Sequence, residues 1–97
     1  MPDPAVEPLK PPEAKQLVRS IVENGTVEFS GHAIAEMEKD ELDTTDCLNL
    51  LRAGVYNPPE LTNGEWRYRI ETQRICVVFA FTSETRMRVV TAWRFKQ

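Results

Sequence analysis

The spacing of the apolar residues changes once along this 97-residue chain, from helical spacing before residue 55 to alternation after residue 64. Helical spacing places apolar side chains on one side of a helix, whereas alternation places them on one face of a strand. The order of the two patterns predicts an α+β fold. We expect two or three N-terminal helices packed on a three- to four-stranded antiparallel sheet.

Three helices are expected before the sheet. The first begins near Glu13 and stops at Asn24-Gly25, a pair typical of a left-handed helix end. Ser30 is expected to cap a short second helix. A third helix begins at the acidic segment 43–46 and ends at Gly54.

The strands follow from residue 63 onward. Asn63-Gly64 is a strong signal for a tight hairpin turn, and residues 65–71 then alternate strictly. Residues 74–82 are apolar on both faces, which is typical of a central strand. In the last strand, residues 86–94, unbroken alternation would place Trp93 on the face opposite the arginines. Trp66, Tyr68 and Trp93 are therefore predicted to lie in the core.

The domain organisation is simple. Residues 1–12 contain five prolines and are predicted to form a disordered tail before a single α+β domain at residues 13–97. The sequence has no membrane-length apolar run and no signal-peptide pattern at its start, so we expect a cytoplasmic protein that does not contact a membrane. Cys47 and Cys76 lie in apolar segments without metal-ligand spacing, and they are expected to be buried free thiols.

Charge is distributed unevenly. Residues 1–60 carry 12 Asp and Glu against 5 Lys and Arg, whereas residues 61–97 carry 3 against 7. Because the predicted sheet lies in the second segment, its arginines could form a cationic face that suits phosphate. The alternative is that arginine only fills the solvent side of the strands.

Several segments together resemble a known group. Residues 29–37 (FSGHAIAEM), the helix 46–54, the segment 64–68 and the end VVTAWR at 89–94 are similar to a small bacterial family of unknown function. The signature of that family is a Ser-x-His-Ala-x-x-Arg-Met helix followed by a short sheet ending in Val-x-Thr. Here Glu36 stands where the signature has arginine.

That family is similar to the RelE/MqsR-like toxins of type II toxin-antitoxin systems. The resemblance implies a RelE/MqsR-like fold and a toxin-like endoribonuclease that cleaves single-stranded messenger RNA without a metal or other cofactor. It also implies an antitoxin protein as partner.

Metal-free RNA cleavage needs a base for the 2′-hydroxyl proton and cationic groups for the charge that develops on phosphorus. His32, the only histidine, is the candidate base, and Arg69 and Arg88 are the candidate catalytic arginines. The ring of His32 could instead have a structural role at the start of its helix. The expected RNA-binding residues are Arg67, Arg74, Arg86, Arg94 and Lys96.

The alternative function is non-enzymatic. The acidic second helix and the overall net charge of −3 would suit a degenerate family member that acts as a protein-protein interaction module.

Overall fold

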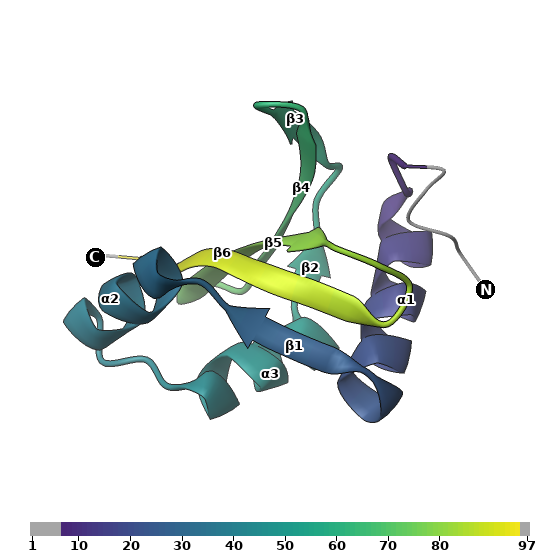
Figure 1. Cartoon of the computed structure of the whole chain (residues 1–97). Coiled ribbons are helices and arrows are strands. Elements are labelled where there is room, and N and C mark those ends of the chain that lie inside the picture. Colours follow the sequence, from purple (N-terminus) through teal and green to yellow (C-terminus); the bar gives the residue numbers. More distant parts are fainter. Residues whose placement is uncertain (1–6, 96–97) are drawn as a thin grey trace.

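The computed structural model of the protein describes residues 7–95. Its elements follow in the order α1 (Pro11–Asn24), β1 (Thr26–Phe29), α2 (Gly31–Lys39), α3 (Thr44–Ala53), β2 (Val55–Tyr56), β3 (Glu60–Thr62), β4 (Glu65–Glu71), β5 (Ile75–Phe81) and β6 (Arg86–Arg94). The fold is α+β, with three helices packed against one mixed sheet (Figure 1).

Local capping residues set the limits of α2 and α3, as the sequence predicts. The Ser30 hydroxyl oxygen accepts a hydrogen bond from the backbone N–H of Ala33 at 3.0 Å and so caps α2. At the start of α3, Asp43 and Asp46 each accept a hydrogen bond from the other's backbone N–H, at 2.8 and 3.0 Å. These caps satisfy N–H groups that have no partner within the helix.

The end of α1 differs from the prediction. Gly25 has φ −115° and ψ −149°, so the expected left-handed stop is wrong. The backbone there passes so close to the carbonyl group of Thr85 that a Cβ atom at Gly25 would collide with it. Glycine is required by this close approach to the β5–β6 turn, not by its freedom to adopt positive φ.

The sheet has six strands and is mixed, so the prediction of three or four antiparallel strands is corrected. Its order is β1-β6-β5-β4-β2, and β3 pairs with β4 beside β2. β1 and β6 are parallel, with Thr26 opposite Arg86 and Phe29 opposite Val89. The short strands of this sheet are β1, β2 and β3. Their pairing depends on long-range contacts, which a local sequence pattern does not specify.

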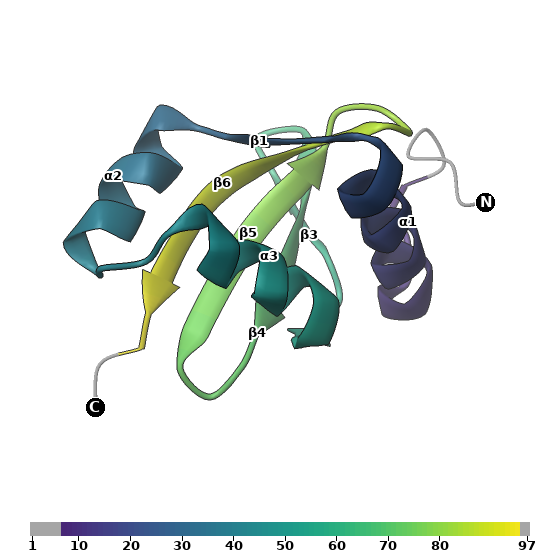
Figure 2. The same ribbon diagram turned by 90° about the horizontal axis from the view of Figure 1, so that it is seen from below.

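The helices cover one face of the sheet. α3 lies across β4 and β5, α1 lies beside α3, and α2 packs along β6 (Figure 2). The core between these layers includes Leu17 and Ile21 of α1, Leu51 of α3 and Phe79 of β5, all 0 to 1% exposed. Among residues 7–95, no helix is both long and apolar enough to span a bilayer.

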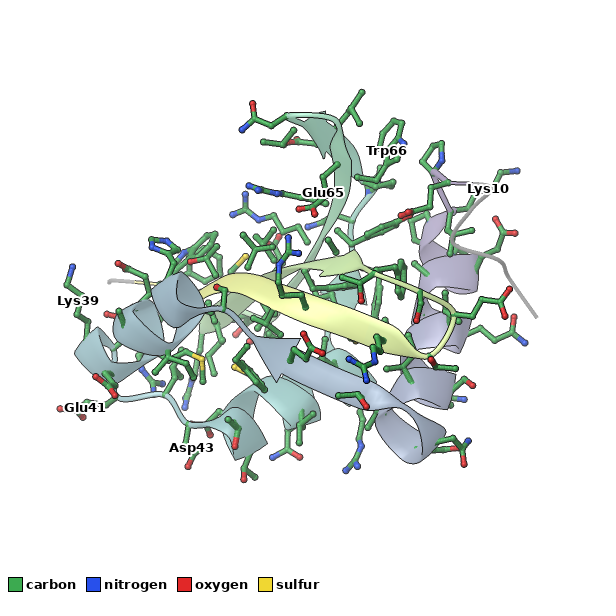
Figure 3. All side chains as sticks on the ribbon, viewed as in Figure 1. Lys10, Lys39, Glu41, Asp43, Glu65 and Trp66 are labelled. Carbon is green, nitrogen blue, oxygen red and sulfur yellow. The ribbon has the colours of Figure 1, made fainter. Side chains whose placement is uncertain are left out.

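The β3–β4 hairpin projects from the sheet toward the face that these helices leave uncovered (Figure 1). Its turn is the predicted Asn63-Gly64, with φ 51° and 78°. Figure 3 shows Glu65 and Trp66 on opposite sides of this hairpin, Glu65 above the sheet and Trp66 toward the side of α1. Trp66 packs partly buried against the core, as predicted.

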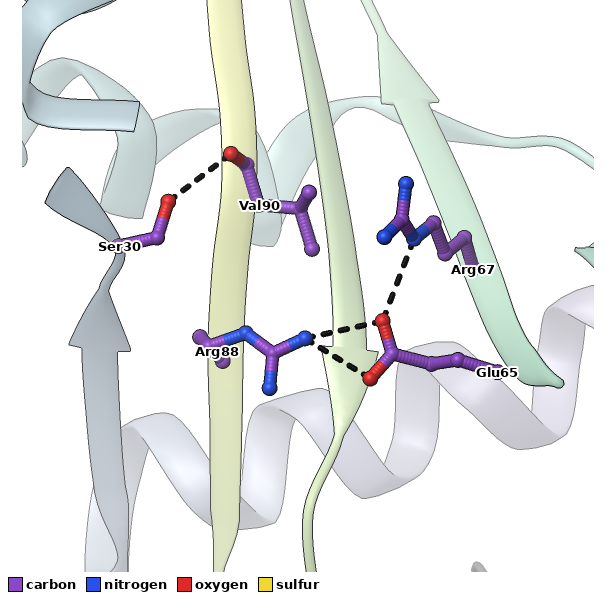
Figure 4. Close-up of polar contacts among 5 residues, drawn as sticks. All are labelled: Ser30, Glu65, Arg67, Arg88 and Val90. Atoms are coloured by element: carbon purple, nitrogen blue, oxygen red, sulfur yellow. Dashed lines mark hydrogen bonds and ion pairs between the residues drawn. The ribbon is translucent and has the colours of Figure 1, made fainter. Parts of the chain in front are cut away.

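A β-bulge in β6 reverses the alternation after Val89. Phe79 pairs with Val89 but Val78 pairs with Thr91, so Val90 is an extra residue. The Ser30 hydroxyl donates a hydrogen bond to the Val90 carbonyl at 3.0 Å (Figure 4). The prediction of Trp93 in the helix-side core is therefore wrong: beyond the bulge Ala92 faces that core, and Trp93 faces the other side.

The first described residues are held by Tyr68, which is buried in β4 as predicted. Its hydroxyl accepts a hydrogen bond from the Leu9 N–H at 3.0 Å and donates one to Glu7 at 2.6 Å. Leu9 is 4% exposed and belongs to the core, and α1 already begins at Pro11. Of the predicted tail at residues 1–12, residues 1–6 lie outside the described part, and residues 7–12 are placed against the domain.

Candidate functional site

The sheet brings two arginine rows onto its uncovered face. On β5, Val78 pairs with Arg69 and Ala80 pairs with Arg88. Since Val78 and Ala80 are two residues apart, they point to the same face, and so do their arginine partners. Arg67 and Arg69 of β4 therefore share one face with Arg86 and Arg88 of β6.

A groove of about 690 Å³ lies between this face and the β3–β4 hairpin. Its floor includes Val78 and Thr91, and one wall includes Pro59 and Glu60 of the segment before and within β3. The charged and aromatic residues that line it are Glu60, Arg67, Arg69, Glu71 and Trp93. The groove thus combines cations, carboxylates and a half-buried aromatic ring.

Arg69 and Trp93 form the centre of the groove. The guanidinium carbon of Arg69 lies 5.3 Å from the centroid of the Trp93 ring, within the range of a cation–π contact. Nε of Arg69 is 3.3 Å from the Glu71 carboxylate. Cys76 lies under this cluster: burial raises the pKa of its thiol, although the adjacent Arg69 acts in the opposite direction.

Arg67 and Arg88 both bind Glu65. Nη2 of Arg88 lies 2.9 and 2.8 Å from the two Glu65 carboxylate oxygens, and Nε of Arg67 lies 3.2 Å from one of them (Figure 4). Partial burial pushes the pKa of Glu65 upward, but the hydrogen bonds from Arg88 and Arg67 outweigh it and hold the pKa below its usual range. Glu65, Arg67 and Arg88 form an ion-pair triad, which connects the end of the β3–β4 hairpin to β6 across β5.

Arg88 itself does not line the groove, and neither do the other arginines predicted for the site that lie outside β4. Arg86 is exposed and pairs with Glu28 of β1 at 2.9 Å. Arg94 ends β6, where its Nε donates to the Asp40 carbonyl at 3.1 Å and its backbone N–H donates to the Asp40 carboxylate at 2.7 Å. Arg74 is exposed in the turn between β4 and β5. Lys96 lies outside the described residues.

His32 is exposed in the first turn of α2, and it is not among the residues that line the groove. A second, smaller hollow of about 520 Å³ lies between α2 and the end of β6, and His32 does not line it either. The residues that line this hollow are Glu36, Lys39, Asp40, Trp93, Arg94 and Phe95. Glu36, at the position where the family signature has arginine, pairs there with Lys39 at 3.8 Å.

Sequence reasoning placed Glu65 and Glu71 on the same polar face as Arg67 and Arg69 but gave them no role in the site, and it placed Trp93 on the wrong face. The two glutamates alternate with Arg67 and Arg69 along β4, and that alternation was a usable signal for carboxylates beside the arginines. No comparable local signal existed for Trp93, because its face depends on the bulge in β6.

The described residues offer no obvious place for a metal. Between residues 7 and 95, no group of three His, Cys, Asp or Glu side chains is arranged to hold an ion. The two cysteines are buried and unpaired, as predicted. Burial, reinforced by Asp46 and Asp43, raises the pKa of Cys47 to about 11, so its thiol is neutral near pH 7.

Comparison with known proteins gives one match. The family model described as "Domain of unknown function (DUF4258)" matches residues 29–94, from the end of β1 to the end of β6. No curated protein and no solved structure matches the chain. The matched range contains the whole groove and covers more than half of the 97 residues. The chain therefore belongs to the family of the domain of unknown function DUF4258.

Proposed function

We propose that the groove binds single-stranded RNA and that the protein is a toxin-like, metal-independent endoribonuclease. The observation that carries this proposal is the placement of Arg69 over Trp93, with Arg67 in the same groove. Aromatic rings on an open sheet face stack on bases, and guanidinium groups bind the phosphates between them. The predicted likeness to RelE/MqsR-like toxins, and with it an antitoxin partner, is part of the same proposal.

The groove offers its own acid–base group for cleavage. In this chemistry the 2′-hydroxyl oxygen attacks the adjacent phosphorus, the bond to the 5′-oxygen breaks, and the product ends in a 2′,3′-cyclic phosphate. The Glu71 carboxylate takes the 2′-hydroxyl proton, and Arg69 and Arg67 bind the non-bridging oxygens. Water supplies the proton to the leaving oxygen, and the hydroxide that remains takes the proton back from Glu71. His32 has no part in this assignment, since it lies outside the groove.

Binding is tested with a fluorescein-labelled U12 oligonucleotide by fluorescence anisotropy at low salt. Loss of a stacking ring costs roughly 1–3 kcal/mol per base, so Trp93→Ala should weaken binding by about five- to a hundredfold. Arg69→Ala should weaken it as well. Arg86→Ala is the matched control, because it removes the same charge from the same face but outside the groove, and it should change the affinity by less than about twofold.

Cleavage is tested on a mixed-sequence RNA in the presence of EDTA, with the product ends identified by mass spectrometry. Glu71→Gln should slow cleavage strongly while leaving RNA binding in place. If the wild-type chain neither binds U12 nor cleaves, or if Arg86→Ala weakens binding as much as Arg69→Ala, the proposal fails.

A second candidate function is supported by the ion pairs on the same face. Arg67 and Arg88 are bound to Glu65, Arg69 to Glu71 and Arg86 to Glu28, so the cations are largely balanced by carboxylates. A face of mixed charge around a half-buried tryptophan is also suited to a protein partner. Under this function, induced expression would not arrest growth, whereas an active ribonuclease would arrest it and the Arg69→Ala variant would relieve the arrest.

A further inference from the structure

Glu65 occupies the space between two arginines as a phosphate group would. Its carboxylate accepts from Arg88 at 2.8 and 2.9 Å and from Arg67 at 3.2 Å. The two distances to Arg88 are those of charge-assisted hydrogen bonds, and the contact to Arg67 is longer. A phosphodiester presents two oxygens and one negative charge in the same way. The two arginines come from β4 and β6, so the protein holds them in place independently of one another.

The strand between them leaves room for this arrangement. Ala80 of β5 pairs with Arg88, and strands β4 and β6 stand about 10 Å apart at the usual strand spacing. Ala80 is fully buried but does not belong to the helix-side core, and its methyl group fills little space above the sheet. Two long guanidinium side chains can therefore converge over β5 on a single anion.

The position of Glu65 allows it to leave. It is the first residue of β4, directly after the Asn63-Gly64 turn, and its side chain is 32% exposed. The hydrogen bonds and ion pairs of its carboxylate described above join it to the side chains of these two arginines. A side-chain rotation would place it in water without breaking a backbone hydrogen bond.

We propose that Arg67 and Arg88 form an anion clamp for an RNA phosphodiester, and that Glu65 fills this clamp in the free protein as an internal competitor. The clamp adjoins the groove through Arg67, which lines the groove and binds Glu65. An RNA backbone leaving the groove would displace the carboxylate and take over both guanidinium groups. This inference rests on the proposed function for its RNA ligand, and it adds a regulatory contact to that site.

The first test uses Glu65→Gln, which keeps the shape of the side chain and removes its charge. Binding of fluorescein-labelled U12 should become roughly five- to tenfold tighter, the gain expected when a charge-assisted hydrogen bond to the competitor is weakened. The dependence of log K on log salt should also steepen by about 0.7 for each additional phosphate contact.

Glu28→Gln is the matched control. It removes one negative charge from the same face, but its partner Arg86 is exposed and lies outside the groove. The affinity of this variant should rise by less than twofold. In the double variant Glu65→Gln with Arg88→Gln, the gain from Glu65→Gln should disappear.

The second test uses inorganic phosphate, which separates this inference from the proposed function. In Glu65→Gln, titration with phosphate should shift the NMR signals of the Arg67 and Arg88 Nε–H groups, and in the wild type these signals should stay in place. If this occurs while no variant binds U12, the clamp is supported and RNA binding is not. Glu65→Ala serves as a second variant if Glu65→Gln does not fold.

The inference is overturned if phosphate leaves both signals unchanged in the folded Glu65 variants. It is equally overturned if RNA binding is as tight in the wild type as in Glu65→Gln, or if Glu28→Gln produces the same gain.

Discussion

Gly25 and Gly31 show how the same residue type can be essential at one position and replaceable at another. A Cβ atom at Gly25 would collide with the backbone carbonyl of Thr85, whereas a Cβ atom at Gly31 would meet nothing within 4 Å. Neither glycine has a positive φ. The difference between them is therefore one of space and not of backbone conformation.

Gly25→Ala should lower the free energy of unfolding by about 1–3 kcal/mol, since backbone atoms must move to admit the methyl group. Gly31→Ala is the control, and it should leave the stability unchanged or raise it by up to about 1 kcal/mol. Urea denaturation followed by circular dichroism measures both. Equal effects of the two substitutions would contradict the close approach of Gly25 to Thr85.

Ser30 connects two structural features with one hydroxyl group. It caps α2 through Ala33 and donates to the carbonyl of the bulge residue Val90. Ser30→Ala should cost about 2–3 kcal/mol of stability, because the helix loses its cap and a partly buried carbonyl loses its partner. Ser30→Thr keeps the hydroxyl and should cost less than about 1 kcal/mol. Urea unfolding midpoints measure the stability of both variants. Equal losses of stability in the two would show that the Ser30 hydroxyl group does not stabilise the fold.

At the scale of elements, the hairpin of β3 and β4 is tied to the sheet by an ion-pair triad, and the triad makes stability depend on pH. The folded-state pKa of Glu65 lies below its usual value of 4.5. A carboxyl group of this kind stabilises the fold at pH values above 4.5, and its contribution is lost as the pH falls through the lower folded-state pKa.

The difference in stability between the wild type and Glu65→Gln should therefore be largest at pH 7 and should shrink as the pH falls from 4.5 to 3. Urea midpoints at pH 7, 4.5 and 3 measure it. Glu28→Gln removes an exposed pair and should show only a small difference at each pH. If the stability difference between the wild type and Glu65→Gln stayed constant with pH, the protonation of Glu65 would not be coupled to folding.

The helices could be predicted from sequence because their limits depend on local residues. Asp43 and Ser30 cap the helices that follow them, and the Asn63-Gly64 turn fixes the start of β4. The parallel pairing of β1 could not be predicted, since it joins residues 60 positions apart. In the candidate site, the shared face of Arg67 and Arg69 followed from alternation, but the face of Trp93 was predicted wrongly because a bulge interrupts that alternation.

At the scale of the whole molecule, one core joins α1, α3 and the sheet. The Cα radius of gyration is 12.4 Å, close to the value of about 12.5 Å expected for a compact chain of this length. The core includes residues from α1, which precedes the range matched by the family model. The described helices and strands should therefore unfold together.

Leu17→Ala tests this cooperativity. Leu17 is fully buried in α1, and its truncation should cost about 2–5 kcal/mol. The far-UV circular dichroism and tryptophan fluorescence transitions should shift together, since both tryptophans lie on the sheet. Two separate transitions would show that α1 unfolds independently of the sheet.

Trp93 borders both the groove beneath the hairpin and the hollow beside α2. An indole ring adopts one rotamer at a time, so a molecule that turns it toward one of these spaces reshapes the wall of the other. Occupancy of the two spaces is consequently linked, and ligands that need different orientations of this ring compete without touching each other.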